Sequence, residues 1–107
     1  MDITSTLTKE TLVILFRSFP GQFVLIGGGA LHWIFNSPRL SVDIDLKLVN
    51  PKQEDVIPQI ADVLAKKLPP VVVHLGVSVT CQADLSAQAV RILADGRPVL
   101  RVELATL

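Results

Sequence analysis

The chain has one cysteine, no excess of either charge and no long apolar run. Cys81 is the single cysteine in 107 residues, which excludes an internal disulfide, fits a reducing compartment and predicts a small buried or half-buried side chain. Ten basic residues balance ten acidic ones, which excludes a globally basic surface for non-specific nucleic-acid binding. No apolar run approaches the ~20 residues of a membrane helix. The first residues show no signal-peptide pattern, and we expect a cytoplasmic protein.

The sequence is long enough for one domain and too short for two, so residues 1–107 are expected to form a single core. Half of the residues are apolar. The first half predicts a helix capped by Thr8 and running to about Ser18, then a strand over 23–26 covered on both faces. A helix over 30–35 and an alternating strand over 42–49 follow.

The second half predicts a helix that starts at Asn50-Pro51 or nearer Asp55 and ends at Pro69-Pro70. Alternation then predicts a strand over 71–80. Two further strands, over 87–94 and 98–105, flank Asp95-Gly96, a strong hairpin signal. This order predicts an α+β fold with a mixed, largely antiparallel later sheet and helices packed on one face.

Two motifs carry the chemical information. Gly27-Gly28-Gly29 closes the first predicted strand, and Asp43 and Asp45 lie two residues apart on the next strand, so both carboxylates point to one face. Such a pair is repulsive unless a positive charge lies between its members, and hard oxygen ligands favour Mg²⁺. A glycine turn beside that ion suits a triphosphate. Each motif alone also has a simpler interpretation, as a solvated strand face or a tight turn.

The two motifs occur in the order found in a known group of enzymes. The segments Val24-Leu25-Ile26-Gly27-Gly28-Gly29-Ala30-Leu31 and Pro38-Arg39-Leu40-Ser41-Val42-Asp43-Ile44-Asp45-Leu46 resemble the nucleotidyltransferase signature. More narrowly, they are similar to the AbiEii-type nucleotidyltransferase toxins of bacterial abortive-infection and toxin–antitoxin systems. That family has a third carboxylate, usually Asp, on a strand after a hairpin, and Glu103 falls at this place.

The resemblance implies a nucleotidyltransferase-like fold and an Mg²⁺-dependent transfer of a nucleotidyl group from an NTP to a hydroxyl. It implies that Asp43, Asp45 and Glu103 are the catalytic and metal-binding residues, with one or two Mg²⁺ ions, and that Glu103 helps to deprotonate the acceptor. It implies tRNA as the first acceptor to consider. The residues expected to contact the nucleotide are Gly27, Gly28, Gly29, Arg39, Ser41 and Lys47.

The residues themselves leave alternatives open. Glu103, Arg39 and Ser41 also suit ordinary solvated positions, and Lys47 is either a phosphate contact or a charge partner of the two aspartates. Family members are usually longer and continue into helices that this chain lacks. We therefore expect self-association or a partner, such as an antitoxin protein. The competing hypotheses are a catalytically inactive domain that binds nucleotide or a partner protein, and a folding fragment without function of its own.

Overall fold

The computed structural model describes residues 3–26, 42–50 and 56–104. The predicted helix over 30–35 and five candidate site residues lie outside the described residues: Gly27, Gly28, Gly29, Arg39 and Ser41. The described elements are α1 (Ile3–Ser18), β1 (Phe23–Ile26), β2 (Val42–Leu48), α3 (Val56–Val71), the 3-10 helix η1 (Val73–Leu75), β3 (Val79–Asp84), β4 (Ala89–Ala94) and β5 (Arg97–Leu104).

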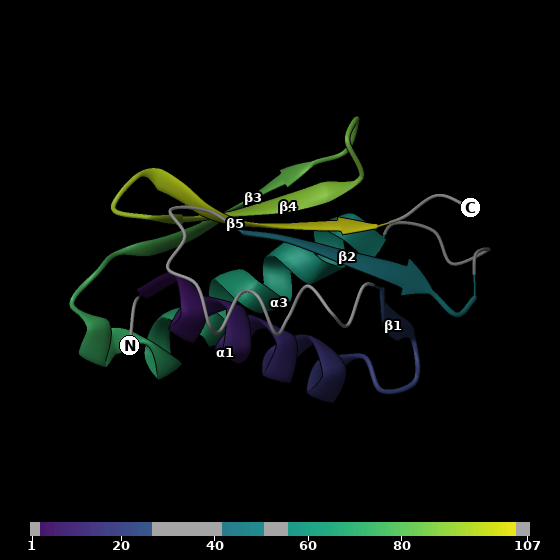
Figure 1. Ribbon diagram of the computed structural model, residues 1–107, viewed down its shortest axis with the longest axis horizontal. Helices are drawn as coiled ribbons and strands as arrows, with labels where there is room; N and C mark the ends of the chain where they lie inside the picture. The colour runs from purple at the N-terminus through teal and green to yellow at the C-terminus, as the bar shows by residue number, and fades with distance from the viewer. Residues whose placement is uncertain (1–2, 27–41, 51–55, 105–107) are drawn as a thin grey trace.

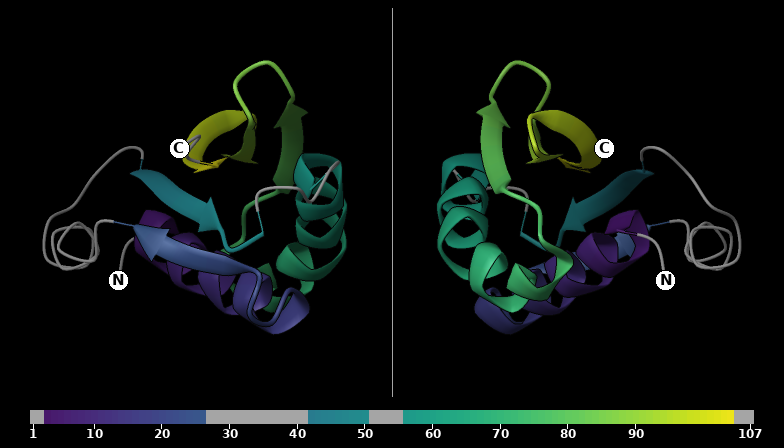
Figure 2. Two further views of the ribbon diagram at one scale, coloured as in Figure 1. Left: turned by 90° about the vertical axis from the view of Figure 1, so that its right-hand side faces the viewer. Right: turned by 90° about the vertical axis from the view of Figure 1, so that its left-hand side faces the viewer.

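These elements confirm the predicted α+β class. The strands form one mixed sheet in the order β1-β2-β5-β4-β3, in which β2 and β5 are parallel and the other neighbours antiparallel. Both helices lie on the same side of the sheet (Figure 1), and the strands twist around them (Figure 2). Helix α3 packs against β3, β4 and α1, and α1 also contacts β5. The sheet face opposite the helices is called the polar face below.

Helix α1 begins at Ile3, so the prediction of a cap at Thr8 is wrong, whereas the predicted end at Ser18 is confirmed. The Thr8 hydroxyl donates a hydrogen bond of 2.7 Å to the carbonyl oxygen of Thr4, one turn back, and is buried inside the helix. The first turns of α1 bury serine and threonine residues as well as Leu7. A buried helix face made of such polar residues does not appear in the sequence as an apolar repeat.

Strand β1 has the predicted bounds but not the predicted burial. Phe23 is buried, whereas Val24 and Ile26 are 52% and 38% exposed. The strand pairs with β2 at the edge of the sheet, and the described helices α1 and α3 lie on one side of that sheet. Strand β2 confirms the predicted alternation, because Ile44 and Leu46 are buried.

Helix α3 begins next to the alternative start at Asp55. Pro58 is tolerated in its first turn, where an N–H group has no partner within the helix. The predicted stop at Pro69-Pro70 is wrong, because the helix continues to Val71. A proline has no N–H group to donate to the carbonyl oxygen one turn back, and the helix ends one residue after Pro70.

The prediction of a strand over 71–80 is also wrong. Val73–Leu75 forms a 3-10 helix that ends at Gly76, whose φ of +70° is left-handed. Strand β3 starts only at Val79 and runs to Asp84. The valine-rich alternation indicated β structure correctly but placed its start too early, because α3 runs to Val71 and the 3-10 helix takes up Val73–Leu75.

The predicted hairpin is confirmed. Asp95 and Gly96 have φ values of +50° and +81° between β4 and β5, the positive values that a tight two-residue turn needs. Ser78 donates a backbone N–H to the Asp95 carboxylate at 2.9 Å and accepts the Asp95 N–H at 2.8 Å. These bonds tie the turn to the start of β3. On β5, Leu100 and Val102 are buried, whereas Val99 packs only partly against the core.

The core lies between the sheet and the two helices. Leu64 on α3 and Leu46 on β2 are fully buried. Cys81 is half-buried against this core, as expected, and burial raises the pKa of its thiol to about 11. At neutral pH the thiol is therefore protonated and unreactive. No helix among residues 3–26 and 56–104 is long and apolar enough to cross a membrane.

Replacing Leu64 by Ala should lower the free energy of unfolding by about 2–5 kcal/mol, because it leaves a cavity at a fully buried position. Urea denaturation followed by circular dichroism measures the change. The control is Val73→Ala, at a side chain that is 74% exposed, which should change the free energy by less than about 0.5 kcal/mol. Equal effects of the two substitutions would contradict this position of the core.

Candidate functional site: carboxylates on the polar face

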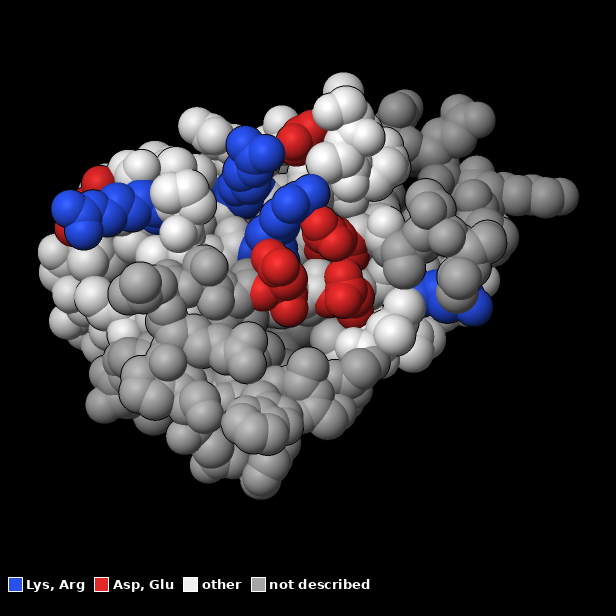
Figure 3. All heavy atoms as spheres, turned by 45° about the horizontal axis from the view of Figure 1, so that its top comes forward, with Lys and Arg blue, Asp and Glu red and all other residues white. Residues whose placement is uncertain are grey.

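Strand β2 presents Asp43, Asp45 and Lys47 on the polar face. All three side chains are exposed, whereas Ile44 and Leu46 between them are buried beneath the sheet. Side chains alternate between the two faces of a strand. Because Ile44 and Leu46 are buried in the core, the charged residues are kept on the opposite face. Figure 3 shows acidic side chains gathered near the middle of the molecule, with basic side chains directly beside them.

The parallel pairing of β2 with β5 brings the third predicted carboxylate to this place. Asp45 is the register partner of Glu103, and Asp43 is the register partner of Arg101. Directly paired residues project to the same face, and neighbouring strands lie about 4.8 Å apart. Asp43, Asp45, Arg101 and Glu103 thus occupy the corners of a four-residue square, called the carboxylate square below.

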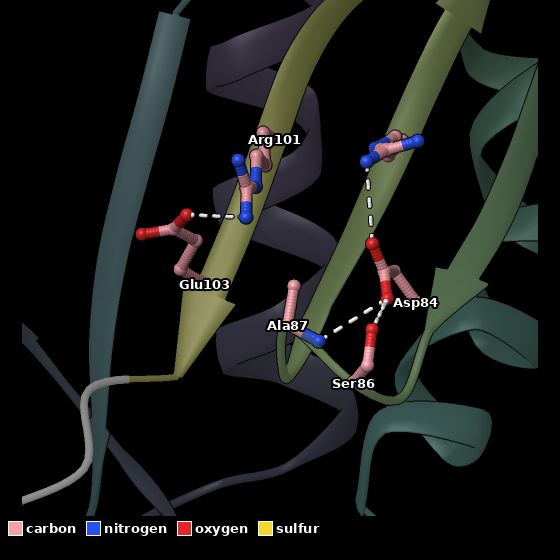
Figure 4. Close-up of polar contacts among 6 residues, drawn as sticks. Asp84, Ser86, Ala87, Arg101 and Glu103 are labelled. Atoms are coloured by element: carbon pink, nitrogen blue, oxygen red, sulfur yellow. Dashed lines mark hydrogen bonds and ion pairs between the residues drawn. The ribbon is translucent and has the colours of Figure 1, made fainter.

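Arg101 and Glu103 form an ion pair within this square. Nη2 of Arg101 lies 2.8 Å from Oε1 of Glu103, and the two side chains are 36% and 33% exposed. In Figure 4 the Glu103 side chain leaves β5 on the side of β2, and its carboxylate meets the end of the Arg101 guanidinium. Nε of Arg101 is buried without a hydrogen-bond partner.

The donor set suits a hard divalent cation, since three carboxylates from adjacent strand positions lie on one face. The side chains do not yet converge, however. Among the described residues, no three His, Cys, Asp or Glu groups are arranged to hold a metal ion. The Glu103 carboxylate is bonded to Arg101 instead. The three carboxylates therefore suit Mg²⁺ in their chemistry and in their backbone positions. To bind the ion together with Asp43 and Asp45, the Glu103 carboxylate would have to leave Arg101.

Strand β1 borders the square on its other side. Ile26 is the register partner of Asp45, and Val24 is the partner of Lys47. Ile26 is the last residue of β1, and Gly27, Gly28 and Gly29 follow it directly in the sequence. Lys47 is exposed on the same face as the two aspartates, as predicted.

Another acidic residue on the polar face, Asp84, has a structural role. Its carboxylate accepts hydrogen bonds from the Ser86 hydroxyl at 2.8 Å and the Ala87 N–H at 3.1 Å, and it pairs with Arg91 at 3.2 Å (Figure 4). The Ser86 bond, then the Ala87 bond, then Arg91 and Arg101 hold the pKa of Asp84 below its ordinary value. These contacts fix the turn between β3 and β4.

Arg101 is a residue of this site to which the sequence patterns assigned no role, whereas the three carboxylates were predicted. The available signal was its position, two residues before Glu103 on a strand, which puts both side chains on one face. An arginine beside a supposed metal ligand could have been recognised as a competing partner for that ligand.

Asp84→Asn should destabilise the protein at neutral pH, because the variant loses the charge that these bonds stabilise. The Asp84 pKa is lower in the folded than in the unfolded chain. Its contribution is therefore present above the unfolded pKa of about 4 and is lost as pH falls through the folded value. Thermal melts from pH 7 to pH 2 should show the difference from wild type shrinking. Asp62→Asn, at an exposed α3 carboxylate, is the control; a pH-independent Asp84 effect would contradict the assignment.

Comparison with known proteins gives one match. The family described as nucleotidyl transferase AbiEii toxin, type IV toxin–antitoxin system, matches residues 13–106. The searches of curated proteins and of solved structures found no match. The matched segment spans most of the chain and includes β1, β2 and β5, the strands that form and border the carboxylate square. The chain therefore belongs to the AbiEii nucleotidyltransferase toxin family, whose description indicates nucleotidyl transfer within a toxin–antitoxin system.

Proposed function

We propose that this protein is an Mg²⁺-dependent nucleotidyltransferase that moves a nucleotidyl group from an NTP to a hydroxyl acceptor, with the carboxylate square as its active site. The observation that carries the proposal is the parallel register of Asp45 with Glu103. It puts a carboxylate from β5 beside the aspartate pair of β2, although Glu103 lies 58 positions after Asp45 in the sequence. The family membership supports the same reaction class.

Asp43, Asp45 and Glu103 are the residues proposed to hold one or two Mg²⁺ ions. When bound, Mg²⁺ would neutralise triphosphate charge and lower the pKa of the attacking hydroxyl. The protein's own part is to fix the ligands on two rigid, paired strands, with the buried residues between them anchored in the core.

The proposed step breaks one bond and forms one. The acceptor oxygen attacks the α-phosphorus of the NTP, the bond from this phosphorus to the bridging oxygen breaks, and pyrophosphate leaves. The hydroxyl proton passes to a carboxylate, and Glu103 is our candidate for this base. Glu103 lies at the side of the square that adjoins β4, because Ala89 on β4 is its other register partner.

The nucleotide phosphates are proposed to contact the glycine turn and the nearby polar residues. Gly27, Gly28 and Gly29 follow β1, whose last residue lies opposite Asp45. Backbone N–H groups in a glycine turn bind phosphate oxygens well. Arg39, Ser41 and Lys47 complete the proposed set, and of these Lys47 is described and exposed on the face of the aspartates.

We propose tRNA as the acceptor and an antitoxin protein as a partner, and both rest on family context. With a net charge of zero, RNA would have to be bound by a local group of basic residues. Arg91 and Arg101 are register partners on β4 and β5, which puts two such side chains beside the carboxylates.

A second candidate function is an inactive domain that binds nucleotide without turnover. The observation that favours it is the ion pair of Glu103 with Arg101, which occupies one of the three proposed ligands. The two candidates differ in whether nucleotidyl transfer occurs at all.

Asp43→Asn and Asp45→Asn should each lower transfer at least about a hundredfold, because each removes a charged metal ligand. Both side chains are exposed, so the free energy of unfolding should change by less than about 0.5 kcal/mol. The assay follows label from each α-labelled NTP in turn to total bacterial tRNA with Mg²⁺.

The matched control is Asp62→Asn, which makes the same chemical change at an exposed residue on α3, the side of the sheet away from the square. Transfer unaffected by Asp43→Asn and Asp45→Asn would refute this active site. Metal-dependent NTP binding without transfer by the wild-type chain would favour the inactive domain.

A further inference from the structure

We propose that Arg101 is an exchangeable counter-ion: it neutralises Glu103 in the metal-free protein, and metal binding must displace it. The inference rests on the proposed function, because it concerns the same carboxylate square. It follows from one conflict in the structure. The proposed function requires Glu103 as a ligand, yet its carboxylate lies 2.8 Å from the Arg101 guanidinium, and the carboxylates do not converge as they stand.

The charges of the square show why such a counter-ion is needed. Asp43, Asp45 and Glu103 lie at adjacent strand positions, and like charges on paired strands repel. Arg101 takes the fourth corner, so three formal negative charges are reduced to two. One divalent cation neutralises two charges. A bound divalent ion would itself relieve the repulsion, and Arg101 relieves part of it when that ion is absent.

The ion pair of Arg101 with Glu103 is weak enough for a competing metal ion to break it. It joins residues two apart on one strand, both side chains are about one-third exposed, and only one guanidinium nitrogen pairs with the carboxylate. Partly exposed pairs of this kind contribute little to stability. Nε of Arg101 is buried and unpaired, so the resting position does not satisfy the guanidinium. Moving the Glu103 carboxylate away from the guanidinium therefore gives up a weak contact.

Arg91 provides a matched comparison on the same face. It is the register partner of Arg101 and also pairs with a carboxylate, at 3.2 Å, but that carboxylate is Asp84 of the β3–β4 turn. Removing either guanidinium deletes one positive charge and one ion pair from the polar face. Only removal of Arg101 frees a residue of the square.

The test is the affinity of the metal-free, full chain for Mg²⁺ by isothermal titration calorimetry, with Mn²⁺ followed by electron paramagnetic resonance as a second probe. Arg101→Gln should bind Mg²⁺ about tenfold more tightly than wild type, because a competing positive charge is lost from beside the ion. Arg101→Lys, which keeps the charge, and Arg91→Gln should both stay within about threefold of wild type. Thermal melts check that each variant is folded.

A measurement on the wild-type chain needs no substitution. The side-chain Nε–H resonance of Arg101 in a ¹⁵N-labelled sample should move when Mg²⁺ is added, and that of Arg91 should not. The inference would be overturned if Arg101→Gln bound Mg²⁺ with an affinity equal to or weaker than that of wild type. It would also be overturned if the Nε–H resonance of Arg101 did not move when Mg²⁺ is added.

The design separates this inference from the proposed function. If wild type binds Mg²⁺, Asp45→Asn abolishes binding and Arg101→Gln leaves it unchanged, only the counter-ion role fails. If wild type binds no Mg²⁺, the proposed metal site and the inference fail together.

Discussion

The parallel pairing of β2 with β5 is the constraint on which the site depends. It is the only parallel pair among the described strands, and it joins Asp45 to Glu103 and Asp43 to Arg101. On the other face the same pairing stacks Ile44 beside Val102 in the core. A slip of one residue on either strand would turn its apolar residues to solvent and its charged residues to the core. Hydrophobic burial therefore sets the register, and the register assembles the carboxylates.

The polar face shows two uses of an arginine–carboxylate pair. Asp84 is held by Ser86 and Ala87 as well as by Arg91, so its charge is stabilised by several partners and its pKa is lowered. The described contacts of Glu103 include one short contact with Arg101. The first arrangement has the character of a fixed structural turn. In the second arrangement, a metal ion could replace Arg101 as the partner of the Glu103 carboxylate. A ligand to an exchangeable ion requires this property.

The sequence predicted the elements that obey a simple period or turn rule. Strand β2 alternates strictly, and Asp95-Gly96 has the turn chemistry of a hairpin, so both were placed correctly. The start of α1 was not, because the buried residues around Thr8 include several hydroxyl side chains, which do not appear in an apolar repeat. The valines after α3 have strand propensity, yet Val73 lies in a 3-10 helix and the strand begins only at Val79. For the site, the residue types and their face were predictable. The pairing of Glu103 with Arg101 was not, since it depends on side-chain conformation.

The charges of the site and the stability of the fold are separated by the pleat of the sheet. Each charged residue of β2 lies between residues whose side chains point to the other face, where Ile44 and Leu46 are buried. The repulsion among the carboxylates therefore acts on a face exposed to water and to counter-ions, where it is screened. The apolar contacts that oppose unfolding lie on the other side of the same backbone. Because the polar face contributes little to the core, three like charges can be kept close together there, which a buried site could not tolerate without a permanently bound cation.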